Sequence, residues 1–500
     1  MNIIKKINRV SEVKQIFKND SPNVSDNILD VFKNFLACKE VQKFGKIKKK
    51  GFSAINILST LLILTFTGVK SVRALFFSGL YNAEDGEKDV YYRLKNNENI
   101  NWRKLLYSIA KRFLYLVRKN RNIDDDKNKE NKITCIIADD STLRKIGEAI
   151  EYIGKVFDHS LGKSVLGFKL LVIAFWDGVS FIPLNFSFHR EKGKNIQKPY
   201  GLSFKKLRKR FSKKREKSSS GYKRVEELNK SKIDMLILMI KSAVKNGFLP
   251  KYVLVDKWFL CEKIIKTVRK LKKGTIHILA PCKMDKRKYI YQGEEYTARA
   301  LLNKLRKSFK RCRFLHCHYI RVVVIYKGHK LCLFFNRGFN TKKWQLLVTT
   351  NLSLNFREAI EIYCIRWTIE VFFKEMKQHL NLGKCQSRDF DSQIADTTIS
   401  IIQYIMLTYL KRFRDYETIG GIFSNSKKFI IEYNLAEKIW GLLCEIIKSI
   451  AEMFEMPINR IMRKLFDNPQ FEKTIFKFIS DDYIENELIN KNKELLDNVI

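Results

Sequence analysis

Short apolar runs that end at an acidic residue are the clearest pattern in the middle of the chain. Ile133–Ala138 is mostly apolar and is followed directly by Asp139. Tyr252–Val255 is wholly apolar and stops at Asp256. Continuous apolar runs of this length are typical of strands that are buried on both faces. We therefore predict two buried strands, each with a carboxylate at its end.

The same pattern predicts the elements around these strands. Gly167–Trp176 and Phe181–Phe188 are expected to form a hairpin, because the Asp177-Gly178 pair between them is a turn signal. Helix and strand then alternate over Lys232–Asn246, Tyr252–Val255, Trp258–Leu271 and Ile276–Ala280. Three strands followed by helix, strand, helix and strand is the order of a ribonuclease H-like core. An α/β fold of that kind is therefore expected, by analogy of element order.

A later helix, beginning near Phe356, carries an unusual row of polar side chains. At roughly 100° per residue, one arc of this helix holds five polar side chains beside an apolar face. The five are Tyr363, Arg366, Glu370, Lys374 and Lys377. A single carboxylate among cations suits a metal ion next to phosphate. An ordinary amphipathic helix with ion pairs between successive turns is the alternative.

The spacing of this row resembles a known signature. Tyr363, Arg366, Glu370 and Lys377 match Y-x2-R-x3-E-x6-K without a gap. In this the chain is similar to the DDE transposases of bacterial insertion sequences, in the branch named after those four letters. The resemblance covers about residues 130–390 and requires two aspartates upstream, each at the end of a strand.

Asp139 and Asp256 meet that requirement. The resemblance implies that Asp139, Asp256 and Glu370 are catalytic and bind two Mg²⁺ ions, with Mn²⁺ as a substitute. Asp140 is the alternate to Asp139. Carboxylates at one sheet edge can hold two such ions roughly 4 Å apart. The alternatives are that Asp139 or Asp140 caps a turn, and that Asp256 caps a helix beginning at Trp258.

Composition favours a polyanionic partner. The chain has 500 residues, 96 Lys and Arg against 52 Asp and Glu, and a net charge of +44. So large a charge favours nucleic acid as the partner, with a membrane surface second. The basic start lacks the apolar segment of a signal peptide, and Phe52–Val69 holds too many polar residues for a membrane span. We expect a cytoplasmic, nucleoid-associated protein without a membrane partner.

Two further features are open to more than one interpretation. Lys205–Arg224 contains eleven Lys and Arg residues and one acidic residue, so it either contacts phosphates or is a solvated charge run. Trp344 precedes the helix of the signature and is similar in position to a tryptophan on which hairpin-forming members of the branch stack a flipped base. It could equally be a core residue of a strand, since Leu346 and Val348 alternate with it.

The elements and the resemblance together predict five parts and a function. The parts are a helical DNA-binding region (1–130), the first part of the core (131–280), a β-rich insertion (281–350), the last part of the core (351–392) and a helical, dimerising C-terminal region (393–500). The resemblance implies cleavage of DNA at the element's ends and strand transfer into target DNA by a homodimer, with Tyr363, Arg366, Lys374 and Lys377 binding phosphates. The alternatives are a basic DNA-binding protein without activity and a metal-dependent nuclease that does not join strands.

Overall fold

The computed structural model describes most of the chain. The described residues are 28–45, 47, 51–69, 71–77, 87–120, 132–413, 418–428 and 430–431, with isolated positions beyond. Contacts divide the chain into two compact units, of which one comprises Met1–Thr65 and Ser71–Phe423. All elements described below belong to this unit.

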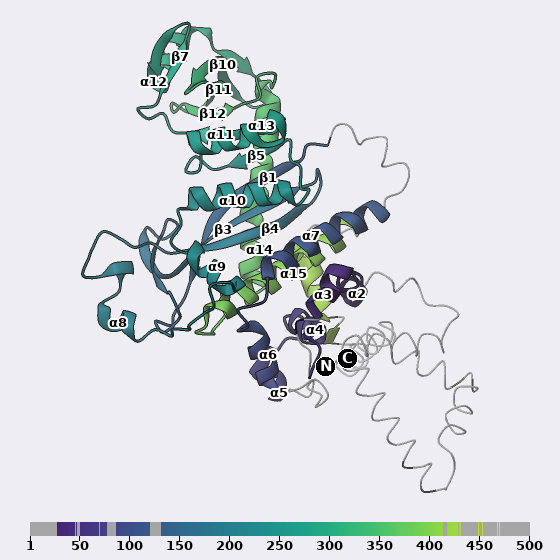
Figure 1. Cartoon of the computed structure of the whole chain (residues 1–500). Coiled ribbons are helices and arrows are strands. Elements are labelled where there is room, and N and C mark those ends of the chain that lie inside the picture. The colour runs from purple at the N-terminus through teal and green to yellow at the C-terminus, as the bar shows by residue number, and fades with distance from the viewer. Residues whose placement is uncertain are drawn as a thin grey trace, which may run out of the picture. The chain divides into compact units, whose positions relative to one another are not determined.

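A mixed sheet forms the centre of the unit (Figure 1). β1 (Cys135–Arg144) pairs antiparallel with β3 (Lys163–Trp176) and parallel with β5 (Tyr252–Val255), and β5 pairs parallel with β6 (His277–Cys282). On the other side, β3 pairs with β2 (Gly154–Asp158) and with β4 (Phe181–His189). The predicted hairpin is confirmed: the Asp177 side chain accepts hydrogen bonds from the amides of Val179 and Ser180 in the turn.

The region after β6 continues the same sheet. It contains β7 (Lys288–Tyr291), β8 (Glu294–Thr297), β9 (Lys310–Cys312), β10 (Cys317–Tyr326), β11 (His329–Gly338) and β12 (Gln345–Thr349). β12 returns antiparallel to β6, with Leu346 opposite Cys282, so the start of β12 lies where β6 ends. The segment also includes a helix that the sequence pattern did not predict, α12 (Ala298–Leu305), which begins at the side-chain cap of Thr297.

Helices cover the sheet. The N-terminal helices are α2 (Ile28–Leu36), α3 (Lys39–Gly45), α4 (Ala54–Leu64), α5 (Val72–Phe77), α6 (Lys88–Lys95) and α7 (Trp102–Lys119). Those that follow are α8 (Phe204–Arg208), α9 (Ser220–Glu227), α10 (Lys232–Lys245), α11 (Glu262–Lys270), α13 (Phe356–Cys364), α14 (Thr368–His379) and α15 (Phe390–Phe413). Helix α15 is buried along most of its length and packs on α7, α2, α4, α6 and β4. In Figure 1, α7 and α15 lie side by side, so helices from both ends of the chain form one layer.

Three boundaries differ from the sequence-based expectation. β1 does not stop before Asp139 but continues to Arg144, because β3 is long enough to pair with all of it. The short strand β2 was not predicted. Helix α11 begins at Glu262 with Cys261 at its cap position, so Asp256 does not cap that helix. The polar linker predicted up to Lys132 lies almost entirely outside the described residues, as does most of the region after Phe413.

The prediction of an α/β fold is confirmed by the large mixed sheet and its helices. Within the described residues, no helix is both long enough and apolar enough to cross a membrane.

Candidate active site

Asp139 and Asp256 come where the pairing of two parallel strands ends. The last pair of β1 and β5 is Ala138 opposite Val255; Asp139 is the next residue of β1, and Asp256 directly follows β5. Beyond this point β1 loses its neighbour on the β5 side, and its residues change from buried to half-buried. The polar sequence from Asp139 to Thr142 is therefore tolerated inside a strand, because one side of it is open to solvent.

Asp139 and Asp140 point to opposite faces of the sheet, as successive strand residues must. The Asp139 carboxylate accepts a hydrogen bond from Arg366 at 2.9 Å. The Asp140 carboxylate instead lies 3.1 Å from the Lys232 ammonium and 4.0 Å from that of Lys169. Of the two acids, Asp139 is thus the one on the side of the signature helix.

The signature residues lie on one nearly continuous helix. Helix α13 begins with a capping box, in which Asn355 and Glu358 satisfy each other's backbone amides. It leads through a single 3₁₀ turn, Ile365–Trp367, into α14. Its apolar face packs into the core: the Phe372 ring lies 5.3 Å from that of Phe181 on β4 and 4.8 Å from that of Tyr404 on α15. This packing fixes the polar face against β1.

Arg366 joins the helix to the strand. Its Nη1 donates to Asp139, and its Nη2 donates to Glu370 one turn further along the helix. The Tyr363 ring lies under the same guanidinium, 5.6 Å from ring centroid to Cζ. The structure therefore brings Asp139, Tyr363 and Glu370 together around the Arg366 guanidinium.

The electrostatics of the cluster reflect burial and crowding of negative charge. Burial raises the pKa of Asp139 to about 6, Arg366 opposes the rise, and the nearby carboxylates of Asp140 and Asp256 add to it. Burial also raises the pKa of the Tyr363 phenol, so this group stays neutral near pH 7. Asp139 is thus poised so that a bound cation would strongly favour its charged form.

The two lysines of the signature row differ. Lys377 donates from Nζ to the Ser141 hydroxyl at 2.6 Å, two residues beyond Asp139 on β1. Lys374 is exposed on the same helix. Both cations lie on α14, one of them directly beside the strand that carries Asp139.

The donor set fits a hard divalent cation. Carboxylate oxygens are the ligands that Mg²⁺ prefers, and it needs few of them because it keeps several waters. Among the described residues, no three ligating side chains are gathered around one point. The Arg366 guanidinium instead lies between Asp139 and Glu370, where it neutralises the charge that a metal ion would neutralise.

Two tryptophans lie at this edge of the sheet. Trp344 directly precedes β12, is half-buried, and has the Arg337 guanidinium 5.3 Å from its ring. Trp258 lies two residues after Asp256 and is 63% exposed. The sequence pattern at Trp258 predicts only the start of a helix. Its position just past the acid that ends a strand was the signal that could have singled it out.

The basic segment Lys205–Arg224 is in part structural. The Arg215 side chain is 2% exposed and pairs with Glu151, Asp389 and Asp391, and Lys213 pairs with the same two aspartates. Arg224 is also buried and donates to the Phe186 carbonyl oxygen at 2.7 Å. These three cations are held by the protein and are not available to phosphates.

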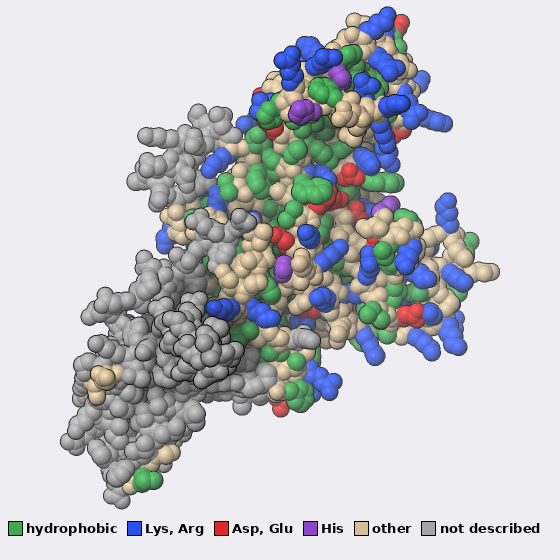
Figure 2. All heavy atoms as spheres, turned by 180° about the vertical axis from the view of Figure 1, so that it is seen from behind, with side chains coloured by type: hydrophobic (Ala, Val, Ile, Leu, Met, Phe, Trp, Pro, Cys, Tyr) green, Lys and Arg blue, Asp and Glu red, His purple; other side chains and the backbone are tan. Residues whose placement is uncertain are grey.

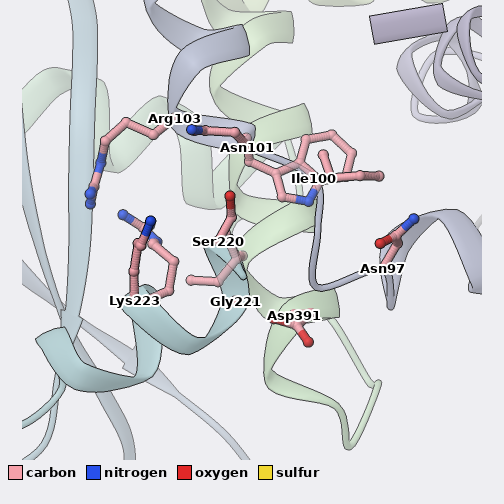
Figure 3. Close-up of a pocket in the computed structure, with 11 residues that line it drawn as sticks. Asn97, Ile100, Asn101, Arg103, Ser220, Gly221, Lys223 and Asp391 are labelled. Atoms are coloured by element: carbon pink, nitrogen blue, oxygen red, sulfur yellow. The ribbon is translucent and has the colours of Figure 1, made fainter. Parts of the chain in front are cut away.

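A pocket lies beside this basic segment. It lies where the N-termini of α7, α9 and α15 approach one another, and Figure 3 shows Gly221 of α9 next to Asp391 of α15. A Cβ on Gly221 would lie 2.4 Å from an Asp391 carboxylate oxygen, so glycine permits this approach. The pocket's buried cation, Arg224, and its neighbour Arg103 both pair with Glu227.

A comparison with known protein families gives a match to part of the chain. Residues 222–406 match a family model described as "Transposase DDE domain". No curated protein matches the chain. The matched region contains β5 and α14, and therefore Asp256 and Glu370, but begins after Asp139. Over this region the chain is similar to the DDE domain of transposases, which supports the expected class of DNA-acting enzyme.

Proposed function

We propose that the protein is a DDE transposase that cuts DNA at the ends of an insertion sequence and joins those ends to a target. One observation supports the proposal: Asp139 of β1 and Asp256, which directly follows β5, come where the pairing of these two parallel strands ends, and Arg366 donates to both Asp139 and Glu370 of α14. The match to a transposase DDE domain supports it independently. The four-residue spacing, Tyr363 to Lys377, favours the branch of bacterial insertion sequences.

The residues can be given roles from their chemistry. Asp139, Asp256 and Glu370 would hold two Mg²⁺ ions, which supply activation of the attacking oxygen and stabilisation of the leaving oxygen when bound. The Arg366 guanidinium is a planar donor suited to two phosphate oxygens. Lys377 and Lys374 are point charges on the same helix, and Lys377 already donates to a hydroxyl on β1. The neutral Tyr363 phenol can donate a hydrogen bond to phosphate.

DNA is the partner that the charge favours. Figure 2 shows Lys and Arg side chains spread over the described surface of one face, with fewer acidic side chains among them. With a net charge of +44, the chain would gain much of its affinity for DNA from contacts with phosphates, whatever the base sequence. A homodimer that pairs two element ends is part of the proposal.

The test is an assay on labelled duplexes that carry the inverted repeats flanking the gene, with Mg²⁺ or Mn²⁺. The wild type should release cut ends and form strand-joined products. Asp256→Asn should abolish both while leaving DNA binding within about twofold, because it removes one carboxylate charge from a strongly basic surface. Asp285→Asn, at an exposed acid of the β6–β7 segment, is the matched control and should cut normally.

Other outcomes would decide between the alternatives. Cut ends without any joined product would identify a metal-dependent nuclease. Binding without cutting in either metal would identify a DNA-binding protein without activity.

A further inference from the structure

An exposed aromatic and a lysine lie together at the sheet edge that carries Asp256. Parallel strands β5 and β6 end at Val255 and Cys282, and their carboxyl ends lie at the same edge. Trp258 follows the first strand and Lys283 follows the second. The Lys283 ammonium lies over the indole of Trp258, 3.6 Å from its centroid.

Most of Trp258 is accessible beside this contact, since 63% of the residue is exposed. The His159 ring, just after β2, flanks it at 6.2 Å between centroids and a tilt of 40°. Phe157 lies 5.0 Å beyond His159 and is 39% exposed. The indole is therefore part of an aromatic surface and not a single scattered apolar residue.

A flat open ring with a cation behind it matches the chemistry of a nucleotide. A nucleobase stacks on an indole face whatever its identity, because every base has a π-face. A lysine held by a cation–π contact keeps N–H donors free for a phosphate oxygen. Duplex DNA cannot offer a base face to this ring, whereas an unpaired strand can.

We propose that Trp258 and Lys283 form a subsite for one unpaired nucleotide next to the phosphate that is cut. The base stacks on the exposed indole of Trp258, and its phosphate pairs with Lys283. The inference rests on the proposed function, because it takes the edge with Asp139 and Asp256 as the place where DNA is cut. It names a residue that neither the transposase signature nor the family match assigns.

The test is binding of fluorescent single strands in EDTA, so that no cutting is needed. One probe is an oligothymidylate of about twelve nucleotides, within the usual range of single-strand site sizes. The other is an abasic deoxyribose-phosphate chain of equal length, which keeps the phosphates and lacks the bases. Trp258→Leu should weaken binding of the first probe by roughly five- to tenfold, at the low end of base–aromatic stacking, and leave the second within about twofold. Trp258→Phe should keep most of the affinity for both.

Lys283→Gln gives the complementary result. It should weaken both probes and lower the slope of log affinity against log salt by about 0.7, the value for one phosphate on a single strand. The matched control is Phe314→Leu. Phe314 is also exposed, at 65%, and has a cation over its ring, with Arg357 at 4.0 Å. It lies elsewhere, between β9 and β10. It should change neither probe.

Two results would overturn the subsite. The first is an equal loss of affinity for both probes in Trp258→Leu, which would mean that the substitution disturbs only phosphate binding. The second is no loss of affinity for either probe. Melting temperatures of Trp258→Leu and Trp258→Phe, expected to equal that of the wild type at so exposed a site, separate these results from misfolding. This binding assay contains no metal and does not depend on cutting. If the wild type failed to cut duplex DNA in the separate assay with Mg²⁺ or Mn²⁺, the proposed function would be overturned but the binding result would stand.

Discussion

Arg366 donates a hydrogen bond from Nη1 to Asp139 at 2.9 Å and another from Nη2 to Glu370. The guanidinium is only 13% exposed, and its Nε is buried without a hydrogen-bond partner among the described residues. A cation that bridges two carboxylates stands where a divalent ion shared by them would stand. Arg366 and such an ion are therefore expected to exclude each other, and the displaced guanidinium becomes free to bind phosphate.

Removal of Arg366 should tighten metal binding. In Arg366→Ala the carboxylates lose their competing cation, and Mn²⁺ measured by calorimetry without DNA should bind roughly tenfold more tightly, the equivalent of one charge-assisted hydrogen bond. Arg357→Ala is the control, because Arg357 forms the same kind of pair with Glu361 one turn apart on α13. Weaker or unchanged Mn²⁺ affinity in Arg366→Ala would show that the guanidinium does not occupy the metal position.

Arg215 should matter for stability and not for DNA. Its side chain is almost fully buried among Glu151, Asp389 and Asp391. Arg215→Met therefore removes the cation that pairs with Glu151 and leaves Lys213 to pair with the two aspartates. Loss of one partner from a buried ionic cluster costs roughly 3–5 kcal/mol, which urea unfolding can measure. The adjacent exposed Lys214, changed to Met, should leave the urea midpoint unchanged. Equal midpoints for the two variants would contradict the structural role of Arg215.

His189 should make the fold sensitive to acid. His189 is 4% exposed, and this burial lowers its pKa from 6.5 to about 4. The nearby Lys232 ammonium also lowers the pKa, whereas the Lys230 carbonyl, Glu227 and Asp140 oppose the shift. Below pH 6.5 the unfolded chain binds a proton that the folded protein does not. The histidine's contribution is therefore complete above pH 6.5 and is lost as the pH falls towards 4, by roughly 3 kcal/mol.

The measurement compares unfolding of the wild type and His189→Gln between pH 4 and pH 7. Other groups also titrate in this range, but they are common to both proteins. The wild type should lose more stability than the variant as the pH falls. A difference between the two that does not change with pH would mean that folding does not shift the pKa of His189.

Hydrophobic runs and helical spacing in the sequence predicted the strands and helices that these short-range patterns determine. The runs that became β3, β4, β5 and β6 were visible as hydrophobic stretches, and the row on α13 and α14 followed from helical spacing. The end of β1 was misjudged because a polar stretch can stay in a strand when a long neighbour such as β3 pairs with it. Strand β2 has only five residues and alternates in burial, which is too short a signal to separate from a loop.

Partners distant in sequence could not be predicted. Arg215 appeared to be one cation of a basic run, because Glu151 is 64 residues away and Asp389 is 174. The choice between Asp139 and Asp140 likewise needed the sheet, since only the fold decides which face of β1 meets α14. The role of Asp139 in cutting DNA stays a prediction.

Trp344 is expected to be a packing residue at the sheet edge where β6 ends and β12 begins. It is half-buried, its Nε1 is buried without a partner among the described residues, and Arg337 lies over its ring. Trp344→Ala should therefore lower stability by on the order of 2 kcal/mol, about half the cost of truncating a fully buried tryptophan, and slow every DNA-processing step in proportion. Trp344→Phe keeps a ring and removes the unpaired donor, so its stability should equal that of the wild type within about 1 kcal/mol.

A role in holding a flipped base would give a different pattern. Trp344→Ala would then melt near the normal temperature, nick the first strand at the normal rate and slow only the later processing of the end. Trp258→Leu provides the comparison within the same protein, because it should melt normally yet bind base-containing single strands less tightly. If both variants melt normally but are impaired with DNA, both tryptophans contact bases. If only Trp258→Leu behaves in this way, Trp258 is the tryptophan that contacts DNA, and Trp344 is a packing residue at the start of β12.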